Sequence, residues 1–352
     1  MGQATAIEWA DSSLNLMMGC DGCELWNPDA GNRHCYAGTL TERYKGKSGW
    51  PLAFDKPALF LDRLDDAIRW PDMTGTARPG KPWLDGRPRM IFLNDMGDTF
   101  TGSLPLDWLA KPYGPSTCPN GHKRPRVQWL AEHGVWCCSA AKCGLSWKPS
   151  SPLELMAKSP HVWMLLTKRG SRMRQFSEAH PLPPNVWPGV SITKRVTLPR
   201  VQELLGVKGG GVRWVSAEPL LEGVDLGHWL VKRGVPVAGC TWTTAWQPRI
   251  DFVILGGESG PGARPMRLSW WRSLVRQCAA ASVPCFSKQA GAHLLDDTGA
   301  DVWPTGVRFH VGATMEAPRR IQFRDPKGGD MEEWVEDLRV REFPEVHAKP
   351  GN

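Results

Sequence analysis

The sequence predicts an α/β fold built on a parallel sheet, and two of its features indicate this. Short apolar runs rich in Val, Ile, Phe and Trp recur along the chain, as buried parallel strands do. Amphipathic stretches lie between these runs, which is the pattern of repeated strand–helix units. The chain has 352 residues, 41% of them hydrophobic, and can bury a substantial core. We therefore expect a full or partial (β/α) barrel, or an open doubly wound sheet.

Six apolar runs are the expected strands. They occupy residues 89–95, 162–169, 186–192, 212–219, 251–259 and 283–289. The clearest expected helices occupy residues 170–180, 197–206 and 269–281. In the last of these, apolar residues recur at helical spacing and Ser269 is the expected N-cap.

Two segments interrupt this alternation and divide the chain. Residues 1–111 and 150–291 are expected to form the barrel core with its N-terminal loop. Residues 112–149 are rich in Pro, Gly, Cys and basic side chains and look like an inserted module. Residues 292–352 form a peripheral C-terminal extension, in which short strands and an acidic helix over 330–338 are expected.

Polar residues stand at the carboxyl ends of the expected strands. In both candidate architectures these ends meet on one face, where ligands bind. The candidates on this face are Asn94, Asp95, Asp98, Thr167, Lys168, Arg169, Ser191, Glu218, Glu258 and Lys288. Glu218 and Lys288 are the expected catalytic residues, the alternative being an ion pair that holds the face together.

The remaining strand-end residues are candidates for cofactor binding. Lys168 suits a phosphate or carboxylate, and Asn94 and Asp95 suit ribose hydroxyls. Ser191 is expected to contact the same ligand. The stretch "GGESGPGARP" lets backbone N–H groups approach an anion, so Gly256, Gly257 and Glu258 are further candidates. The alternative is a tight turn in which Glu258 pairs with Arg264 or Arg267.

Cys20, Cys23 and Cys35 precede the first clear strand, in a segment rich in Gly, Asn and Asp. Three thiolates on a [4Fe–4S] cluster leave one iron open to an exogenous ligand. Glycines in the segment would let it curl around such a cluster. A zinc site completed by His34, or ordinary buried thiols, would explain the same residues.

The insert carries a second set of metal-binding residues. Cys118 and His122 with Cys138 and Cys143 could form a four-ligand zinc site, with Cys137 as an alternative to Cys138. A metal would explain how a segment too short and polar to bury a core becomes ordered. An auxiliary iron–sulfur site is the second possibility. The nearby basic residues Lys123, Arg124 and Arg126, with Trp129 and Trp136, would suit a nucleic acid, or they form a solvated loop.

Composition limits the class of protein. The formal charge of +7 gives mild support for an anionic partner such as a nucleic acid or nucleotide. The alternative is that diffuse charge of this size serves solubility alone. No secretion signal and no membrane-spanning run is recognisable, so we expect a cytoplasmic protein without a membrane partner. In that compartment, ten cysteines indicate metal or redox chemistry rather than disulfides.

Several motifs together resemble one known family. "IEWADSSLNLMMGC", "HCYAG", "LLTKR", "NVWPGVSI", "VSAEPLLEGVDL", "GGESGPGARPM" and "FSKQAG" follow in order from Ile7 to Gly291. They resemble the phage- and prophage-associated three-cysteine-motif proteins, which are similar to radical S-adenosylmethionine (SAM) enzymes.

The resemblance implies a partial (β/α)6 barrel with a [4Fe–4S] cluster on Cys20, Cys23 and Cys35. SAM would bind the open iron and be cleaved to a 5′-deoxyadenosyl radical, and Gly256-Gly257-Glu258 resembles the motif near the SAM amino group. The cysteine spacing here is C-x2-C-x11-C, whereas the wider superfamily has C-x3-C-x2-C.

Three functions follow as expectations. The first is a radical-SAM-like enzyme that takes electrons from an external donor and modifies a nucleic acid, nucleotide or related anionic substrate. The second is a zinc-stabilised nucleic-acid-binding phage or prophage protein without catalysis. The third is an electron-transfer or regulatory iron–sulfur protein.

Overall fold

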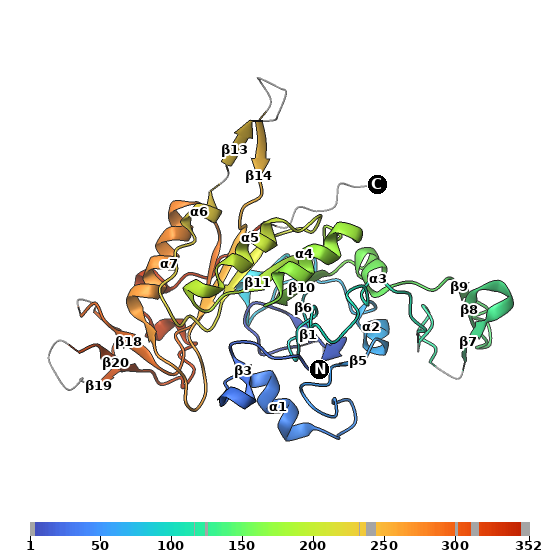
Figure 1. Ribbon diagram of the computed structural model, residues 1–352, viewed down its shortest axis with the longest axis horizontal. Helices are drawn as coiled ribbons and strands as arrows, with labels where there is room; N and C mark the ends of the chain where they lie inside the picture. Colours follow the sequence, from blue (N-terminus) through green and yellow to red (C-terminus); the bar gives the residue numbers. More distant parts are fainter. Residues whose placement is uncertain are drawn as a thin grey trace. The chain divides into compact units, whose positions relative to one another are not determined.

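The main element of the fold is a seven-stranded parallel sheet (Figure 1). A computed structural model describes residues 4–115, 117–123, 126–231, 233–236, 244–299, 302–310 and 317–345. The strand order is β1 (Ser12–Leu14), β6 (Met90–Leu93), β10 (Val162–Thr167), β11 (Val186–Ser191), β12 (Trp214–Ala217), β15 (Phe252–Gly256) and β17 (Cys285–Gln289). The predicted α/β class with a parallel sheet is confirmed.

All six expected strands are present, and β1 is an additional seventh. It escaped prediction because it is three residues long, Ser-Ser-Leu, and too short to show an apolar run. It pairs in parallel with β6, with Ser12 opposite Ile91. Its position matters because the segment with the three cysteines follows it directly.

The chain divides into two compact units. The first comprises 1–188 and 207–211, and the second comprises 189–206 and 212–352. Helices of the first unit are α1 (Tyr36–Tyr44), α2 (Asp62–Ala67), α3 (Pro152–Lys158) and α4 (Gly170–Ala179). Its small antiparallel sheets pair β2 (Met17–Met18) with β5 (Ala58–Leu59) and β3 (Trp26–Asn27) with β4 (Asn32–Arg33).

The insert forms its own antiparallel sheet of β7 (Val127–Leu130), β8 (Val135–Cys138) and β9 (Ser146–Trp147). The first residues of the insert are hydrogen-bonded to α2. Asp65 accepts from the Tyr113 hydroxyl at 2.6 Å and from the Thr117 N–H at 3.2 Å. Its exit is the capped start of α3, where Ser151 accepts from the Glu154 N–H and Glu154 accepts from the Ser151 N–H.

The second unit contains α5 (Pro199–Leu205), α6 (Gly227–Leu230) and α7 (Leu268–Ala280). A hairpin joins β13 (Arg233–Pro236) to β14 (Thr244–Gln247), and a second sheet has the order β16 (Met266–Arg267), β18 (Leu294–Asp296), β20 (Arg319–Gln322) and β19 (Arg308–His310). The predicted N-cap of α7 is wrong. Arg267 occupies that position, and the Asp297 carboxylate accepts from the Ser269 N–H at 3.0 Å and hydroxyl at 2.6 Å.

The C-terminal extension is less peripheral than expected. The predicted acidic helix is two short 3-10 turns, Met331–Glu333 and Glu336–Leu338. Trp334 between them is fully buried and its ring lies 4.9 Å from that of Trp271 in α7. The apolar side chains of this segment therefore belong to the core of the second unit.

Close packing of large aromatic side chains fixes the second half of the sheet. Trp214 of β12 is fully buried opposite Gly189 of β11. A Cβ at position 189 would lie 2.3 Å from the Trp214 ring, so only glycine allows this contact. Among the described helices, none is both long and apolar enough to cross a membrane.

Candidate functional site

The three predicted cysteines lie on one segment of the first unit, residues 15–35, which we call the cysteine loop. It starts after β1 and ends where Cys35 occupies the N-cap of α1. Cys23 is close enough to Cys20 and to Cys35 to raise the pKa of both thiols. Cys20 is buried beside Trp26 and Phe54, and Cys35 packs against the same cluster. Cys23 thus lies near each of the other two cysteines, and burial is the larger cause of the raised pKa at both Cys20 and Cys35.

Two glycines set the path of the cysteine loop around Cys20. Gly19 has φ +96°, and a Cβ there would lie 2.8 Å from the Phe54 carbonyl oxygen. Gly22 has φ +92°, and its Cβ would lie 2.6 Å from the Trp26 carbonyl oxygen. Both positions require a left-handed backbone and leave no room for a side chain. The loop conformation is thus encoded by these glycines rather than by the cysteines.

Asp21 anchors the loop to the segment that follows β6. Its carboxylate accepts hydrogen bonds from the Gly102 N–H, the Ser103 N–H and the Ser103 hydroxyl. Its own N–H donates to the Thr101 hydroxyl at 3.1 Å. These hydrogen bonds lower the pKa of Asp21 although burial raises it, so the carboxylate is ionised at neutral pH.

Two cations at the end of β10 face the cysteine loop. Arg169 donates to the Gly22 carbonyl oxygen at 3.1 Å, lies 3.6 Å from Asp21, and interacts with the Cys20 sulfur. Partial burial lowers the pKa of Lys168, but the nearby Cys23 and Cys35 raise it, and the net shift is upward. Both side chains therefore supply positive charge beside the three sulfurs.

Asp98 holds this end of β10 in place. It is buried and accepts from the Thr167 hydroxyl at 2.6 Å, the Lys168 N–H at 2.9 Å and the Phe100 N–H at 3.0 Å. The carboxylate thus links the end of β6 to the end of β10. The polar residues that follow β6 are therefore hydrogen-bonded to those at the end of β10, the neighbouring strand.

Burial makes the Cys20 and Cys35 thiols harder to ionise. Burial raises the pKa of Cys20 to about 11, and burial also raises the pKa of Cys35. Backbone N–H groups oppose this effect, from Gly22 at Cys20 and from Gly38 at Cys35, and the Leu25 N–H donates to the Cys23 sulfur at 3.4 Å. Metal binding here must release protons.

The residue types of the cysteine loop are those that an iron–sulfur cluster requires, and binding of a cluster stays a prediction. Cys thiolates bind the irons of a cluster, and backbone N–H groups donate hydrogen bonds to the sulfurs; the cysteine loop contains groups of both kinds. Three thiolates on a cluster also carry negative charge, which Lys168 and Arg169 offset.

Asn94 and Asp95, predicted to bind ribose, are engaged in holding the cysteine loop. The Asn94 amide oxygen accepts from the N–H groups of Leu16 at 2.8 Å and Met17 at 3.1 Å, and its nitrogen donates to Thr99 at 2.9 Å. Asp95 accepts from the Asn15 amide at 2.5 Å, and burial raises the Asp95 pKa. These contacts give both residues a positioning role, and ribose binding stays a prediction.

The second unit gathers its own predicted residues. Lys288 and Glu218 form an ion pair at 3.0 Å, with side chains 22% and 15% exposed. The Ser191 hydroxyl donates to the Glu218 carbonyl oxygen at 3.3 Å. A Cβ on Gly256 would lie 3.0 Å from the Glu218 carboxylate. The sequence left two roles open for Glu218 and Lys288, catalysis or a structural ion pair, and the structure shows that the ion pair forms. A catalytic role stays a prediction.

The Gly-Gly-Glu motif has a local structural explanation. A Cβ on Gly257 would lie 2.3 Å from the Ala290 carbonyl oxygen, so β15 and the segment after β17 approach through this glycine. Glu258 forms a bidentate pair with Arg264, at 2.7 and 2.8 Å, and accepts from the Arg264 N–H at 2.8 Å. Contact with SAM stays a prediction for all three residues.

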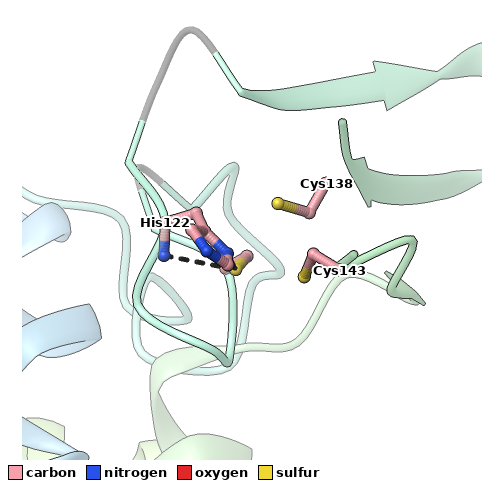
Figure 2. A group of neighbouring side chains, drawn as sticks. His122, Cys138 and Cys143 are labelled. Carbon is pink, nitrogen blue, oxygen red and sulfur yellow. Dashed lines mark hydrogen bonds between the residues drawn. The ribbon is translucent and has the colours of Figure 1, made fainter. Parts of the chain in front are cut away.

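The insert brings its four predicted ligands together (Figure 2). The ligand atoms of Cys118, His122, Cys138 and Cys143 all lie within 4.8 Å of one another, and the group could hold a metal ion. Cys118 and His122 belong to one turn, in which their Sγ and Nδ1 atoms are 3.3 Å apart. Cys138 ends β8, and Cys143 lies in the turn that follows it.

The sheet register selects Cys138 over Cys137. Cys138 lies opposite Val127, whereas Cys137 lies opposite Gln128, so the two thiols face opposite sides of β8. A hydrogen bond from the Leu145 N–H is the main cause that lowers the pKa of Cys143 to about 7. A thiol that ionises this readily is suited to bind a metal.

A match to one protein family covers most of the chain. A family model described as "Protein of unknown function (DUF5131)" matches residues 4–118 and 146–334. The chain belongs to this family. No curated protein and no solved structure matches it.

The DUF5131 match separates the two candidate sites. It includes the whole cysteine loop, Lys168 and Arg169. It omits residues 119–145, which contain three of the four metal-binding side chains of the insert. The cysteine loop is therefore part of the family framework, while most of the insert is an addition to it.

Some residues of the site carry no sequence signal. Asp21 lies between two cysteines, but nothing in the spacing shows that it bonds to residues 102 and 103. The sequence also did not predict the packing of Trp26. Its ring lies so close to Gly38 that a Cβ there would be 2.5 Å away. Arg124, noted in the sequence, lies outside the described residues.

Proposed function

We propose that this protein is a radical-SAM-like iron–sulfur enzyme. The observation that carries the proposal is that Cys20 and Cys35 share one apolar cluster, with Arg169 and Lys168 at the end of a parallel strand beside the cysteine loop. We propose that the three thiolates hold a [4Fe–4S] cluster and that the family shares the partial-barrel architecture and phage association implied by the motifs. When bound, cluster and SAM together supply a 5′-deoxyadenosyl radical on reduction by an external donor.

The protein's own residues would prepare this site. Arg169 and Asp21 hold the cysteine loop against the end of β10, as their contacts at 3.1 and 3.6 Å indicate. Lys168 lowers the cost of placing anionic sulfur in a partly buried position. Glu218 and Lys288 are the proposed acid–base pair of the second unit, since an ion pair at 3.0 Å can hold or transfer one proton.

Zinc is the metal we propose for the insert. Three cysteines and one histidine form the donor set of structural zinc sites. Among the described residues, the buried cluster beside it consists of Val127 and Ala140 with two of the cysteines, and the partly buried Trp136 and Trp147 pack against it. A core of this size is too small to order the module by itself. A zinc ion would therefore supply much of the folding free energy of the insert.

The proposed substrate is a nucleic acid, a nucleotide or a related anion, in keeping with the net charge of +7. A zinc-stabilised nucleic-acid-binding protein without catalysis is the second candidate, and the four-residue metal group favours it. The two candidates differ in whether the cysteine loop holds iron.

The test is SAM cleavage by anaerobically purified protein. After reduction with dithionite, wild-type protein should release 5′-deoxyadenosine, and a Cys35→Ala variant should not. The Cys35→Ala variant should keep its zinc, since Cys35 is not among the ligands of the insert. A colourless wild-type protein with zinc alone would refute the enzyme. A brown protein that leaves SAM intact would instead indicate an electron-transfer or regulatory role.

A further inference from the structure

Three tryptophans form a row across the sheet of the insert. Trp129 of β7 lies directly opposite Trp136 of β8, and Trp136 lies directly opposite Trp147 of β9. Directly opposite residues share one face of a sheet. The ring centroids of Trp129 and Trp136 are 5.4 Å apart. We call these three side chains the tryptophan row.

The tryptophan row is only partly explained by packing. Trp136 and Trp147 pack against the small cluster of Cys118, Val127 and Cys138, so they cover the metal group. Trp129 stands outside that cluster and is 43% exposed. A large aromatic side chain at the open end of an aromatic row is a surface for stacking against a planar ligand.

The charge of the insert favours an anionic ligand. Residues 112–149 contain five basic residues and one acidic residue, a net charge of +4 out of +7 for the whole chain. Arg126 directly precedes β7 and Lys148 directly follows β9, and both are exposed. Because β7 and β9 both run antiparallel to β8, these two cations stand at opposite ends of the strands that carry the tryptophan row.

We propose that the tryptophan row and its flanking cations bind single-stranded nucleic acid. Aromatic side chains stack on bases, and cations along the row track the phosphates. A duplex hides the faces of its bases inside the helix, so an aromatic platform favours a single strand. This inference names the substrate class of the proposed enzyme and the surface that binds the substrate. The role of that surface in catalysis rests on the proposed function.

The location of the insert in the chain supports this assignment. Residues 119–145 lie between the two segments that match the family. Trp129, Trp136 and Arg126 lie in this unmatched stretch, whereas Trp147 and Lys148 belong to the segment that matches the family. A module that recruits substrate can be added in this way without changing the sheet.

The test is fluorescence anisotropy of the full-length, metal-loaded protein with a labelled single-stranded oligothymidine, at several salt concentrations. Wild-type protein should bind the single strand more tightly than a duplex of equal length. Trp129→Ala should weaken binding by about tenfold, and Trp129→Phe should keep most of it. Arg126→Gln should lower the slope of log affinity against log salt by about one unit.

Leu130→Ala is the matched control. Leu130 is on the same strand, 40% exposed, and adjacent to Trp129, so it points to the opposite face of β7. Its substitution should leave the affinity unchanged. Equal losses for Leu130→Ala and Trp129→Ala, preference for the duplex, or no binding at low salt would each overturn the proposal. Zinc content and circular dichroism show whether each variant is folded. If Trp129→Ala does not fold, Trp129→Phe and Arg126→Gln test the proposal in its place.

Failure of this inference is distinguishable from failure of the proposed function. Cys35→Ala should abolish formation of 5′-deoxyadenosine while binding the single strand as wild type does. Loss of strand binding in Trp129→Ala together with intact SAM cleavage would show that the two sites act separately. Strand binding without any SAM cleavage in wild-type protein would leave the inference standing and refute the enzyme.

Discussion

Replacing Gly22 by alanine tests whether the shape of the cysteine loop determines metal binding. Gly22 has φ +92°, and its new Cβ would lie 2.6 Å from the Trp26 carbonyl oxygen. That oxygen already accepts a hydrogen bond from the Cys23 N–H at 3.0 Å. The loop must therefore move at Cys23, and the three thiols can no longer meet as they do in the wild type.

The magnitude follows from two contributions. A left-handed alanine costs about 1–2 kcal/mol relative to glycine. The overlap with a backbone atom that cannot rotate away adds about 1–3 kcal/mol. Gly31→Ala is a control in the same loop, because Gly31 has φ +74° but no atom within 4 Å of its added Cβ. It should incur only the first cost.

The assay combines urea unfolding with iron analysis after anaerobic purification. Gly22→Ala should lose most of its iron and should unfold at lower urea than Gly31→Ala, which should keep its iron. Equal iron content in the two alanine variants would refute the reasoning, because the overlap at Trp26 would then have no consequence for the thiols.

Three further predictions concern other parts of the structure. Lys168→Met should reduce the iron retained on dialysis, by about 1 kcal/mol in affinity, and Lys168→Arg should restore it; equal retention in all three proteins would contradict the role of this cation. Burial, assisted by Arg89, lowers the pKa of His161 to about 4. Stability from neutral His161 is thus fully present above about pH 6.5 and is lost as the pH falls toward 4. Urea unfolding at pH 7 and pH 5 should show about 2 kcal/mol of acid destabilisation that His161→Gln lacks, and an unchanged pH dependence in the variant would refute it. Trp334→Ala should destabilise the second unit by about 3–5 kcal/mol in chemical unfolding, whereas a peripheral extension would lose almost nothing.

The sheet was largely predictable because buried parallel strands leave continuous apolar runs. All six runs form strands, and only β1 is absent from the prediction, since three residues give no pattern. The burial of Trp334 was not predictable, because its polar neighbours resemble a solvated segment and its partner Trp271 lies 63 positions away in sequence.

The metal-binding residues were predictable from their chemistry, but not all their surroundings were. Residue types and spacing predicted the four side chains of the insert, which the structure brings together as a possible metal site. A cluster on Cys20, Cys23 and Cys35 stays a prediction. The choice of Cys138 over Cys137 required the register of β8, because neighbouring residues of a strand face opposite sides. Asp21 and Asp98 act through backbone N–H groups of distant segments, and such contacts leave no mark on spacing or composition.

The central claim is that Cys20, Cys23 and Cys35 hold a [4Fe–4S] cluster. Its most direct test is the amount of iron and acid-labile sulfide in anaerobically purified wild-type protein and in a variant with all three cysteines replaced by alanine. The account predicts about four irons and four sulfides per chain in the wild type and almost none in the variant, with zinc unchanged. Equal iron in the two proteins, or a wild type with neither iron nor sulfide, would contradict it.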